Sequence, residues 1–368
     1  MGPILIVGAG PTGLAAALFL AAEGIGCRII DKAAEPTSQS KALAVNPRTL
    51  ELLETTGVTA RVLAEGRPIR RFQLQRGGEA VLTMELDELG ARFPMTALPQ
   101  ARTEALLAEA LAAYGVHPER SIALEDLSQS QQAATATLVH ADGRRETVDA
   151  PLLFAADGAH SQVRHLLGID FPGSSFPEPW RLADVLLKAP VEAPEGYVEL
   201  HPHGLVFALA FNPAHWRIIS TVGDPLDHLP AGAVVADVPW TSDFHISHRI
   251  AATLAVGRVA LGGDAAHLHS PVGARGMNLG IEDAYVFSRI AKDVLAGAPE
   301  RLADYGRLRH AADKGVVQRI EAISRMARGE GLWSVVREVA PHLAGSLPPL
   351  RKLMEETATG LDHPVRLS

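Results

Sequence analysis

One stretch near the N-terminus, residues 4–31, constrains the fold of this chain more than any other. Its sequence, ILIVGAGPTGLAAALFLAAEGIGCRIID, predicts an apolar strand, a glycine-rich turn, an alanine-rich helix and a second strand that ends in a carboxylate. In such a βαβ unit, Gly8 permits the tight turn, Gly10 lets the backbone approach a pyrophosphate, and Gly13 lets the helix pack closely on the sheet. The phosphates would lie at the helix N-terminus, with Asp31 beside the ribose of an adenosine. The stretch therefore predicts a dinucleotide site.

Charge and cysteine content argue against several classes of partner and site. The 368 residues carry a formal charge of -8, which gives no general attraction to nucleic acid or anionic membranes. The single cysteine, Cys27, excludes an intrachain disulfide and a multi-cysteine metal site, and suits a reducing compartment. No basic region precedes the apolar N-terminus, as a signal peptide would require, and no other segment approaches the roughly 18 apolar residues of a membrane span. We expect a cytoplasmic protein without nucleic-acid or membrane partners.

Hydrophobic patterns predict an α/β fold with an inserted sheet. Continuous apolar runs within 151–169 and 258–267 indicate buried strands of a parallel sheet, whereas alternating segments in 175–250 indicate an antiparallel one. We therefore expect four parts: residues 1–174, the first part of a nucleotide-binding domain; 175–250, an inserted substrate-binding sheet; 251–297, the second part of the nucleotide-binding domain; and 298–368, C-terminal helices.

Local start and stop signals predict several individual elements. A helix should begin after Asn46, which is typical of an N-cap, and end before Gly57. A second helix is expected over 100–114, and the Asp-Gly pair at 142–143 predicts a hairpin. After the loop SPVGARGMN, a helix should begin at about Leu279.

Three strand ends that carry glycine point to the type of dinucleotide. They are the turn Gly8–Gly13, the Asp157-Gly158 pair and the Gly263-Asp264 pair, and each follows an apolar strand. Ligands of open α/β sheets bind at this carboxyl edge. A nicotinamide dehydrogenase requires one βαβ site with a catalytic residue nearby, whereas a flavin dinucleotide needs further contacts for its ribityl chain and ring. The pattern therefore favours FAD.

Three ordered motifs carry a family resemblance over residues 3 to about 325. The segments GAGPTG, DGAHSQVR and GDAAHLHSPVGARGMN are similar to the marks of flavoprotein monooxygenases of the para-hydroxybenzoate hydroxylase type. The resemblance implies an FAD-binding Rossmann-like domain of the GR2 type, an inserted mixed or antiparallel substrate sheet and a C-terminal helical region. It also implies that FAD, NAD(P)H and O2 hydroxylate an aromatic or polyketide-like small molecule through a C4a-hydroperoxyflavin. The tryptophan motif of flavin halogenases is absent, which argues against halogenation.

The resemblance also implies which residues contact the cofactor. Asp31 and Lys32 resemble the adenosine contacts, Gln100 the contact to the ribityl chain or phosphate, and Asp264 the ribityl partner. The backbone of residues 276–278 would hold the pyrimidine end of the flavin. The expected FAD contacts are Gly8, Gly10, Pro11, Thr12, Gly13, Asp31, Lys32, Lys41, Gln100, Asp157, Asp264, Gly276, Met277 and Asn278.

No second G-x-G-x-x-G motif is present for the nicotinamide nucleotide. By the resemblance, Asp157 serves both FAD and NAD(P)H, and Arg164 could pair with a phosphate of a transiently bound NAD(P)H. Two departures from the family pattern stand out. Lys41 replaces an arginine and loses its bidentate fork, and Ala274 replaces the second glycine of the P-x-G-G turn, which narrows the backbone freedom there.

Several polar residues receive no role from the sequence. His267 and His269 have a metal-like spacing, but no further ligand is placed beside them, so we expect packing histidines and no metal site. His201, His203 and Arg217 could contact a substrate hydroxyl, but we assign none of them, and the catalytic residues stay unknown.

Two other functions remain open at this point. An FAD-dependent reductase or dehydrogenase would use the same site without oxygen, and a non-catalytic flavin-bound protein would use it without nicotinamide. The substrate, the choice of NADH or NADPH and the oligomeric state also stay open. The thioredoxin-like C-terminal domain of longer family members is expected to be absent.

Overall fold

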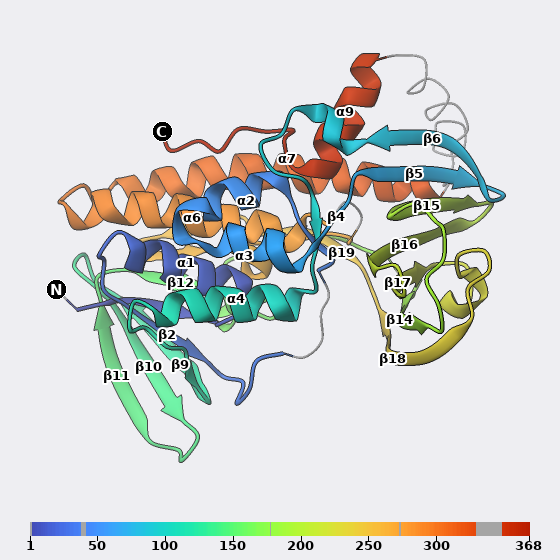
Figure 1. Cartoon of the computed structure of the whole chain (residues 1–368). Helices are drawn as coiled ribbons and strands as arrows, with labels where there is room; N and C mark the ends of the chain where they lie inside the picture. Colours follow the sequence, from blue (N-terminus) through green and yellow to red (C-terminus); the bar gives the residue numbers. More distant parts are fainter. Residues whose placement is uncertain (1, 38–41, 177, 272–273, 329–347) are drawn as a thin grey trace.

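Two large sheets and a group of long helices form the molecule (Figure 1). The computed structural model describes residues 2–37, 42–176, 178–271, 274–328 and 348–368. The sheet that contains the βαβ unit lies with helices α1, α4 and α6, and the second large sheet forms the opposite end of the molecule in this view. The architecture is the α/β type that the sequence predicts.

A six-stranded sheet carries the three glycine-bearing strand ends. Its strands, in spatial order, are β20 (Ala255–Val256), β21 (Val259–Leu261), β12 (Leu153–Ala155), β1 (Ile4–Val7), β2 (Cys27–Asp31) and β8 (Glu119–Arg120). Strand β1 lies between β2 and β12 and runs parallel to both, and β21 runs parallel to β12. The ends of β1, β12 and β21 therefore meet at one edge, as the motifs predict.

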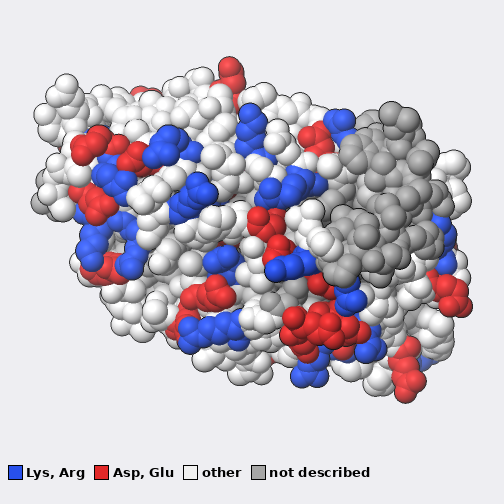
Figure 2. All heavy atoms as spheres, turned by 90° about the horizontal axis from the view of Figure 1, so that it is seen from above, with Lys and Arg blue, Asp and Glu red and all other residues white. Residues whose placement is uncertain are grey.

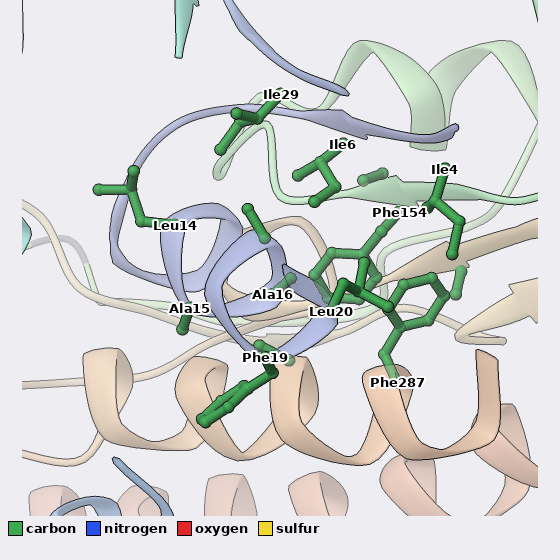
Figure 3. Packing of buried hydrophobic residues seen from close by; sticks show 14 of the residues in the cluster. Ile4, Ile6, Leu14, Ala15, Ala16, Phe19, Leu20, Ile29, Phe154 and Phe287 are labelled. Carbon is green, nitrogen blue, oxygen red and sulfur yellow. The ribbon is translucent and has the colours of Figure 1, made fainter. Parts of the chain in front are cut away.

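Helix α1 (Pro11–Ala22) lies between this sheet and helix α6 (Gly276–Leu295), as Figure 3 shows. Phe154 from β12 stacks on Phe287 from α6 with a ring-centroid distance of 4.4 Å, and Phe19 of α1 meets Tyr285 edge-on at 5.3 Å. A helix covered on both sides must be apolar around most of its circumference, which explains the run of Ala and Leu in α1. This packing fixes α1 and α6 against one another.

The second sheet has seven strands and is mostly antiparallel. In spatial order they are β18 (Val235–Phe244), β14 (Trp180–Leu187), β17 (His215–Ser220), β16 (Gly204–Asn212), β15 (Gly196–His201), β5 (Arg71–Arg76) and β6 (Glu79–Glu85). Strands β15 and β5 pair in parallel, so the sheet is mixed. The two strands at one end of this order, β5 and β6, come from the first part of the chain, and not from residues 175–250. The domain boundaries stay a proposal. Strands from the two expected parts 1–174 and 175–250 both contribute to this sheet.

Smaller sheets and further helices complete the described fold. The three-stranded sheets are β11 (Arg145–Ala150), β10 (Ala134–His140) and β9 (Ile122–Gln129); β13 (Gly173–Ser175), β19 (Ser247–Ile250) and β22 (His267–Leu268); and β3 (Ala44–Val45), β7 (Thr96–Ala97) and β4 (Arg67–Pro68). The other α-helices are α2 (Pro47–Leu53), α3 (Val58–Glu65), α4 (Gln100–Ala112), α5 (Gln162–Leu166), α7 (Arg301–Arg328) and α9 (Pro348–Thr359). Short 3-10 helices are η1 (Glu54–Thr56), η2 (Leu86–Leu89), η3 (Pro225–His228) and η4 (Gly263–Ala265).

Most of the local signals are confirmed. The Asn46 side chain accepts a hydrogen bond from the Thr49 N–H at 2.8 Å and caps α2, and Gly57 ends η1 with a φ of 78°. The predicted hairpin forms between β10 and β11. The expected start of α6 at Leu279 was wrong. The Leu279 N–H already donates to the Arg275 carbonyl at 2.8 Å, so the helix begins at Gly276.

The surface carries charges of both signs. On the face in Figure 2, Lys and Arg side chains are interspersed with Asp and Glu side chains. Within the described ranges, no helix combines the length and the apolar character that crossing a bilayer requires.

Candidate functional site

A cavity of about 560 Å³ opens between the carboxyl edge of the parallel sheet, the start of α6 and one face of the seven-stranded sheet. A volume of this size is typical of small-molecule sites. Predicted FAD contacts from four distant parts of the chain line it: Gly10, Pro11, Thr12, Gln100, Asp264, Gly276 and Met277.

The glycine turn is shaped for close backbone contacts on one side and open space on the other. A Cβ on Gly8, whose φ is 102°, would lie 2.2 Å from the Ala156 carbonyl oxygen, and one on Gly13 would lie 1.9 Å from the Gly8 carbonyl oxygen. A Cβ on Gly10 would meet nothing within 4 Å. Gly8 and Gly13 are therefore required by the fold itself. Gly10 leaves room beside the N-terminus of α1, where a pyrophosphate fits.

Asp31 joins the glycine turn to the end of β2. Its carboxylate accepts hydrogen bonds from the Ala9 N–H at 2.7 Å and the Ala33 N–H at 2.8 Å, and Arg120 lies 3.6 Å away. A carboxylate has about four acceptor positions, so further hydroxyl groups can still bind. Asp31 does not line the cavity. A ribose bound there would extend beyond the cavity along the end of β2.

The first turn of α6 presents backbone donors to the cavity. The helix begins at Gly276, so the N–H groups of residues 276–278 have no acceptor within the helix. The N-terminus of α1 opens onto the same cavity through Gly10 and Thr12. Two helix N-termini therefore direct partial positive charge at one space, which suits a ligand with anionic groups at two positions.

The Asn278 side chain holds the loop before α6, and it lies outside the cavity lining. It is fully buried, accepts from the Asn46 N–H at 3.0 Å and donates to the carbonyls of Ala44 at 2.9 Å and Ala274 at 2.6 Å. Asn278 thus ties the segment 44–46 to the turn that ends at Ala274. Its flavin contact stays a prediction, because Gly276 and Met277 line the cavity whereas Asn278 is fully buried.

Thr12 of α1 packs closely on Gly263, the residue before Asp264. Asp264 is exposed to the cavity from η4. The Thr12 hydroxyl packs so tightly that a Cβ on Gly263 would lie 2.4 Å from it and a Cβ on Gly280 2.2 Å. Small residues at these two positions let α1 approach η4 and α6, which places the Asp264 carboxylate near the pyrophosphate turn.

Gln100 connects the cavity to a buried acid. Its side-chain oxygen accepts from the Ala42 N–H at 3.0 Å, and its amide nitrogen donates to Glu104 at 2.7 Å. Burial raises the pKa of Glu104 despite this hydrogen bond. Lys32 is exposed and does not line the cavity, whereas Lys41 lies outside the described residues.

Asp157 and Arg164 both serve the turn after β12. Asp157 accepts from the Val163 N–H at 3.1 Å at the start of α5. Arg164 is 3% exposed and donates to the carbonyls of Ala265 and Ala159, each at 2.9 Å. Its guanidinium also lies 3.9 Å from the centre of the Phe171 ring. Neither residue lines the cavity. Their contact with NAD(P)H stays a prediction, and the geometry of Arg164 favours a role in positioning the turn.

An apolar wall faces the helix N-termini, and the sequence did not identify it. Trp240, Ser242 and Phe244 of β18, followed by Ile246, line the cavity together with Leu182 of β14 and Ile219 of β17. Within β18, the spacing of two places Trp240, Ser242 and Phe244 on one face of the strand. This alternation in the sequence could have indicated that the three side chains share a face. Only the packing of the sheet shows that this face lines the cavity.

A cluster of buried charges lies behind the cavity. His267 donates to Asp283 at 2.8 Å, and Arg309 donates to Asp283 at 2.6 Å and to Asp313 at 2.7 Å. Burial alone would lower the pKa of His267, but Asp313 and Asp283 raise it to about 9. Burial raises the pKa of Asp313 to about 7 against the effect of Arg309. The expectation that no further ligand lies beside His267 was wrong, because the Asp283 and Asp313 carboxylates could hold a metal ion with it. Arg309 already supplies their positive partner, so we assign no metal.

His269 lines the cavity beside Gly276. A Cβ on Gly276 would lie 3.8 Å from the His269 ring. Burial lowers the pKa of His269 to about 3, so the ring is neutral, and its Nδ1 faces the Ser270 carbonyl at 2.9 Å.

The unassigned residues of the inserted sheet do not reach the cavity. Arg217 is fully buried and forms a bidentate pair with Asp184, at 2.6 and 2.7 Å. His203 is exposed, and His201 packs edge-on against His228 at 5.0 Å. None of these residues is part of the cavity lining.

Comparison with known proteins gives a family match over most of the chain. A family model described as "FAD binding domain" matches residues 1–216 and 226–320. Among curated proteins, 6-methylpretetramide 4-monooxygenase of Streptomyces rimosus is 34% identical over 322 residues, covering 82% of this chain and 58% of that protein. The chain therefore spans a little over half the length of this relative.

Solved structures match over nearly the whole chain. The OxyS anhydrotetracycline hydroxylase from Streptomyces rimosus has a TM-score of 0.81 and 29% identity, covering 98% of this chain and 76% of that chain. The p-nitrophenol 4-monooxygenase from Pseudomonas putida has a TM-score of 0.88 and covers 98% of both chains, at 21% identity. The latter likeness concerns the fold alone.

Proposed function

The chain belongs to the FAD binding domain family, and from this membership we propose that it is a flavin-dependent monooxygenase that uses NAD(P)H and O2 to hydroxylate an aromatic or polyketide-like small molecule. Two of its relatives, at 34% and 29% identity, are a monooxygenase and a hydroxylase. When bound, FAD supplies the redox and oxygen chemistry, which protein side chains cannot perform. The protein must position the substrate, exclude water and stabilise negative charge.

One observation carries the proposal. The N-termini of α1 and α6, together with the Asp264 carboxylate, open onto the same cavity as an apolar sheet face. The two helix N-termini and the Asp264 carboxylate suit the phosphates, ribityl chain and pyrimidine ring of FAD. The sheet face gives a flat organic molecule a place beside the flavin ring. A cofactor site alone would not require the second wall.

The lining favours a neutral aromatic substrate. Leu182, Ile219, Trp240, Phe244 and Ile246 supply apolar area, and an aromatic pair stabilises a stacked ring by about 0.5–1.5 kcal/mol beyond its burial. In the described lining, the cationic side chains are Arg275, which is bound to Asp362 at 3.0 Å, and His267, which is bound to Asp283 at 2.8 Å. A substrate carboxylate would therefore find no ready counter-charge there.

The function is tested by purifying the protein with FAD and measuring oxygen uptake with NADPH and NADH. Substrate-dependent uptake, with one hydroxylated product per NAD(P)H, is the expected result. Asp264→Ala should raise the FAD dissociation constant about tenfold or more, because charge-assisted hydrogen bonds contribute about 1.5–3 kcal/mol. Flavin reduction without oxygen uptake in the presence of substrate would favour a reductase. No reduction by either nicotinamide would favour a non-catalytic flavin protein.

The substrate class is tested with a matched pair, 1-naphthol and 1-hydroxy-2-naphthoate, which differ by one carboxylate. Naphthol should bind more tightly, as measured by the change in the flavin absorption spectrum. Tighter binding of the naphthoate would contradict the neutral-substrate assignment.

A cytoplasmic location is also part of the proposal, supported by the single cysteine.

A further inference from the structure

Buried charged side chains form a continuous chain beneath the cavity. Its members come from α6, α7, the residue before α6 and the segment after α9, and all are nearly inaccessible to solvent. They are Arg275, Glu282, Asp283, Arg309, Asp362 and His363. Burying charges is costly unless each one is paired, so a chain of this length requires an explanation.

One end of this ionic chain holds the Gly263 turn. The Gly263 N–H donates to the Asp283 carboxylate at 2.9 Å, and Arg309 donates to the other oxygen of that carboxylate at 2.6 Å. Gly263 directly precedes Asp264, the carboxylate that lines the cavity. Asp283 therefore fixes the turn that aims the predicted ribityl contact.

The other end holds the loop before α6. Arg275 is fully buried and donates to the Thr357 carbonyl at 2.7 Å and to Asp362 at 3.0 Å. Arg275 directly precedes Gly276, whose N–H begins the row of donors that faces the cavity. The position of these donors thus depends on residues after α9, which no flavin motif includes.

His363 joins the two ends. Its Nδ1 lies 3.0 Å from Asp362 and its Nε2 lies 2.8 Å from Glu282, which also accepts from Arg309 at 3.4 Å. Burial lowers the pKa of His363, but its hydrogen bonds to Asp362 and Glu282 raise it above its ordinary value. The Arg275 guanidinium lies 3.4 Å from the same Nδ1. The second oxygen of Asp362 lies 2.7 Å from Arg319 of α7.

We propose that Asp362 and His363 are positioning residues for the flavin, which hold the first turn of α6 at a fixed distance from the Gly263–Asp264 turn. The inference rests on the proposed function only in taking FAD as the occupant of the cavity. Donors that are fixed before the cofactor binds stabilise its charge without reorganisation, whereas loosely held donors do not. Loss of the pair should therefore weaken FAD binding and disturb the reactive position of the ring.

Asp362→Asn tests this directly, because the amide keeps the shape but removes the charge that Arg275 requires. We expect the FAD dissociation constant to rise about tenfold, measured by the quenching of flavin fluorescence, and more hydrogen peroxide to be released per NAD(P)H oxidised. Asp184→Asn is the matched control. It breaks a buried pair with Arg217 in the seven-stranded sheet and should lower stability without changing the FAD dissociation constant.

An Asp362→Asn protein that is folded, with wild-type FAD affinity and wild-type peroxide release, would overturn the inference. If this variant does not fold, His363→Gln, at a less buried position, decides by the same two measurements. The FAD affinity is measured without turnover. A wild-type protein that binds FAD but consumes no oxygen would refute the proposed activity. The positioning role would still be tested by the FAD affinity of the variants.

Discussion

Ala274 shows how a single departure from the family pattern is accommodated. The sequence places alanine where the P-x-G-G turn has glycine, and the structure gives this residue a φ of 51°. L-residues other than glycine lose roughly 1–2 kcal/mol in this left-handed region. The turn is closed by a hydrogen bond from the Ala274 N–H to the Pro271 carbonyl at 2.9 Å. The fold therefore keeps the conformation of a glycine turn with an alanine in it.

We expect Ala274→Gly to leave the free energy of unfolding unchanged or to raise it by up to about 1 kcal/mol, because relief of the strain offsets the lost methyl contact and the added chain entropy. Ala159→Gly, in a loop that lines the same cavity, lacks that strain and should lose about 0.5–1 kcal/mol. Urea unfolding of both variants is the measurement. An equal loss in both would show that Ala274 is not strained.

The family motif implies that Arg164 contacts NAD(P)H, whereas its hydrogen bonds in the structure indicate a structural role. Arg164→Ala would leave the Ala265 and Ala159 carbonyls without their charged donor, at a cost of about 1–3 kcal/mol for each buried group. We therefore expect a loss of roughly 2–6 kcal/mol in unfolding free energy and an unchanged KM for NAD(P)H in the folded fraction. A raised KM with normal stability would instead support the predicted nicotinamide contact.

At the scale of elements, helix α6 is the main link between the fold and the cofactor site. Its first turn supplies unbonded N–H groups to the cavity, and its middle packs on α1 through Tyr285 and Phe287. Because Gly276 is the first helical residue, these donors lie at the positive end of the helix dipole. Reduced flavin is anionic, so the helix end that we predict to contact the ring could also stabilise its charge.

Gly276→Val should fold, because a Cβ there meets the His269 ring only at 3.8 Å. The added branches would fill space beside that ring, where the flavin is expected. FAD affinity should fall by about tenfold or more, or hydrogen peroxide per NAD(P)H should rise. Gly26→Val, at an open and exposed glycine far from the cavity, is the control. A folded Gly276→Val enzyme with normal affinity, rate and coupling would show that this position does not govern the flavin.

At the scale of the whole molecule, buried charges join elements that are distant in the chain. His267 of β22 pairs with Asp283 of α6, and Arg309 of α7 pairs with Asp283 and Asp313. Removing one partner of such a group leaves an unpaired charge in the interior, which is strongly destabilising. The stability of the molecule should therefore depend on the protonation of His267.

The pKa of His267 is raised to about 9 in the folded protein, above the ordinary value of about 6.5. A raised pKa contributes stability that is fully present below about pH 6.5 and is lost as the pH rises through about 9. Between pH 7.5 and 9 the unfolding free energy should fall by about 1.5 kcal/mol from this group. Urea unfolding of wild type and His267→Gln measures it, with the exposed His203→Gln as control. Equal pH dependence in wild type and His267→Gln would contradict the assignment.

The sequence alone determined those parts of the molecule that depend on short-range rules. Glycine spacing, caps and strand periodicity specified the βαβ unit, the Asn46 cap, the Asp-Gly hairpin and the shared edge of three strands, because turn geometry and side-chain period act over a few residues. The ordered motifs predicted an FAD site, and three of the predicted residues, Gly10, Asp264 and Gly276, line one cavity.

Only the tertiary structure decided which side chains complete the site. The alternation through Trp240 and Phe244 gives two faces, and the packing of the sheet selects the one that lines the cavity. The contacts of Arg275 with Asp362 and of His363 with Glu282 join positions more than eighty residues apart. Periodicity and spacing carry no information about such pairs, because their partners are brought together by the burial of whole helices and not by local geometry.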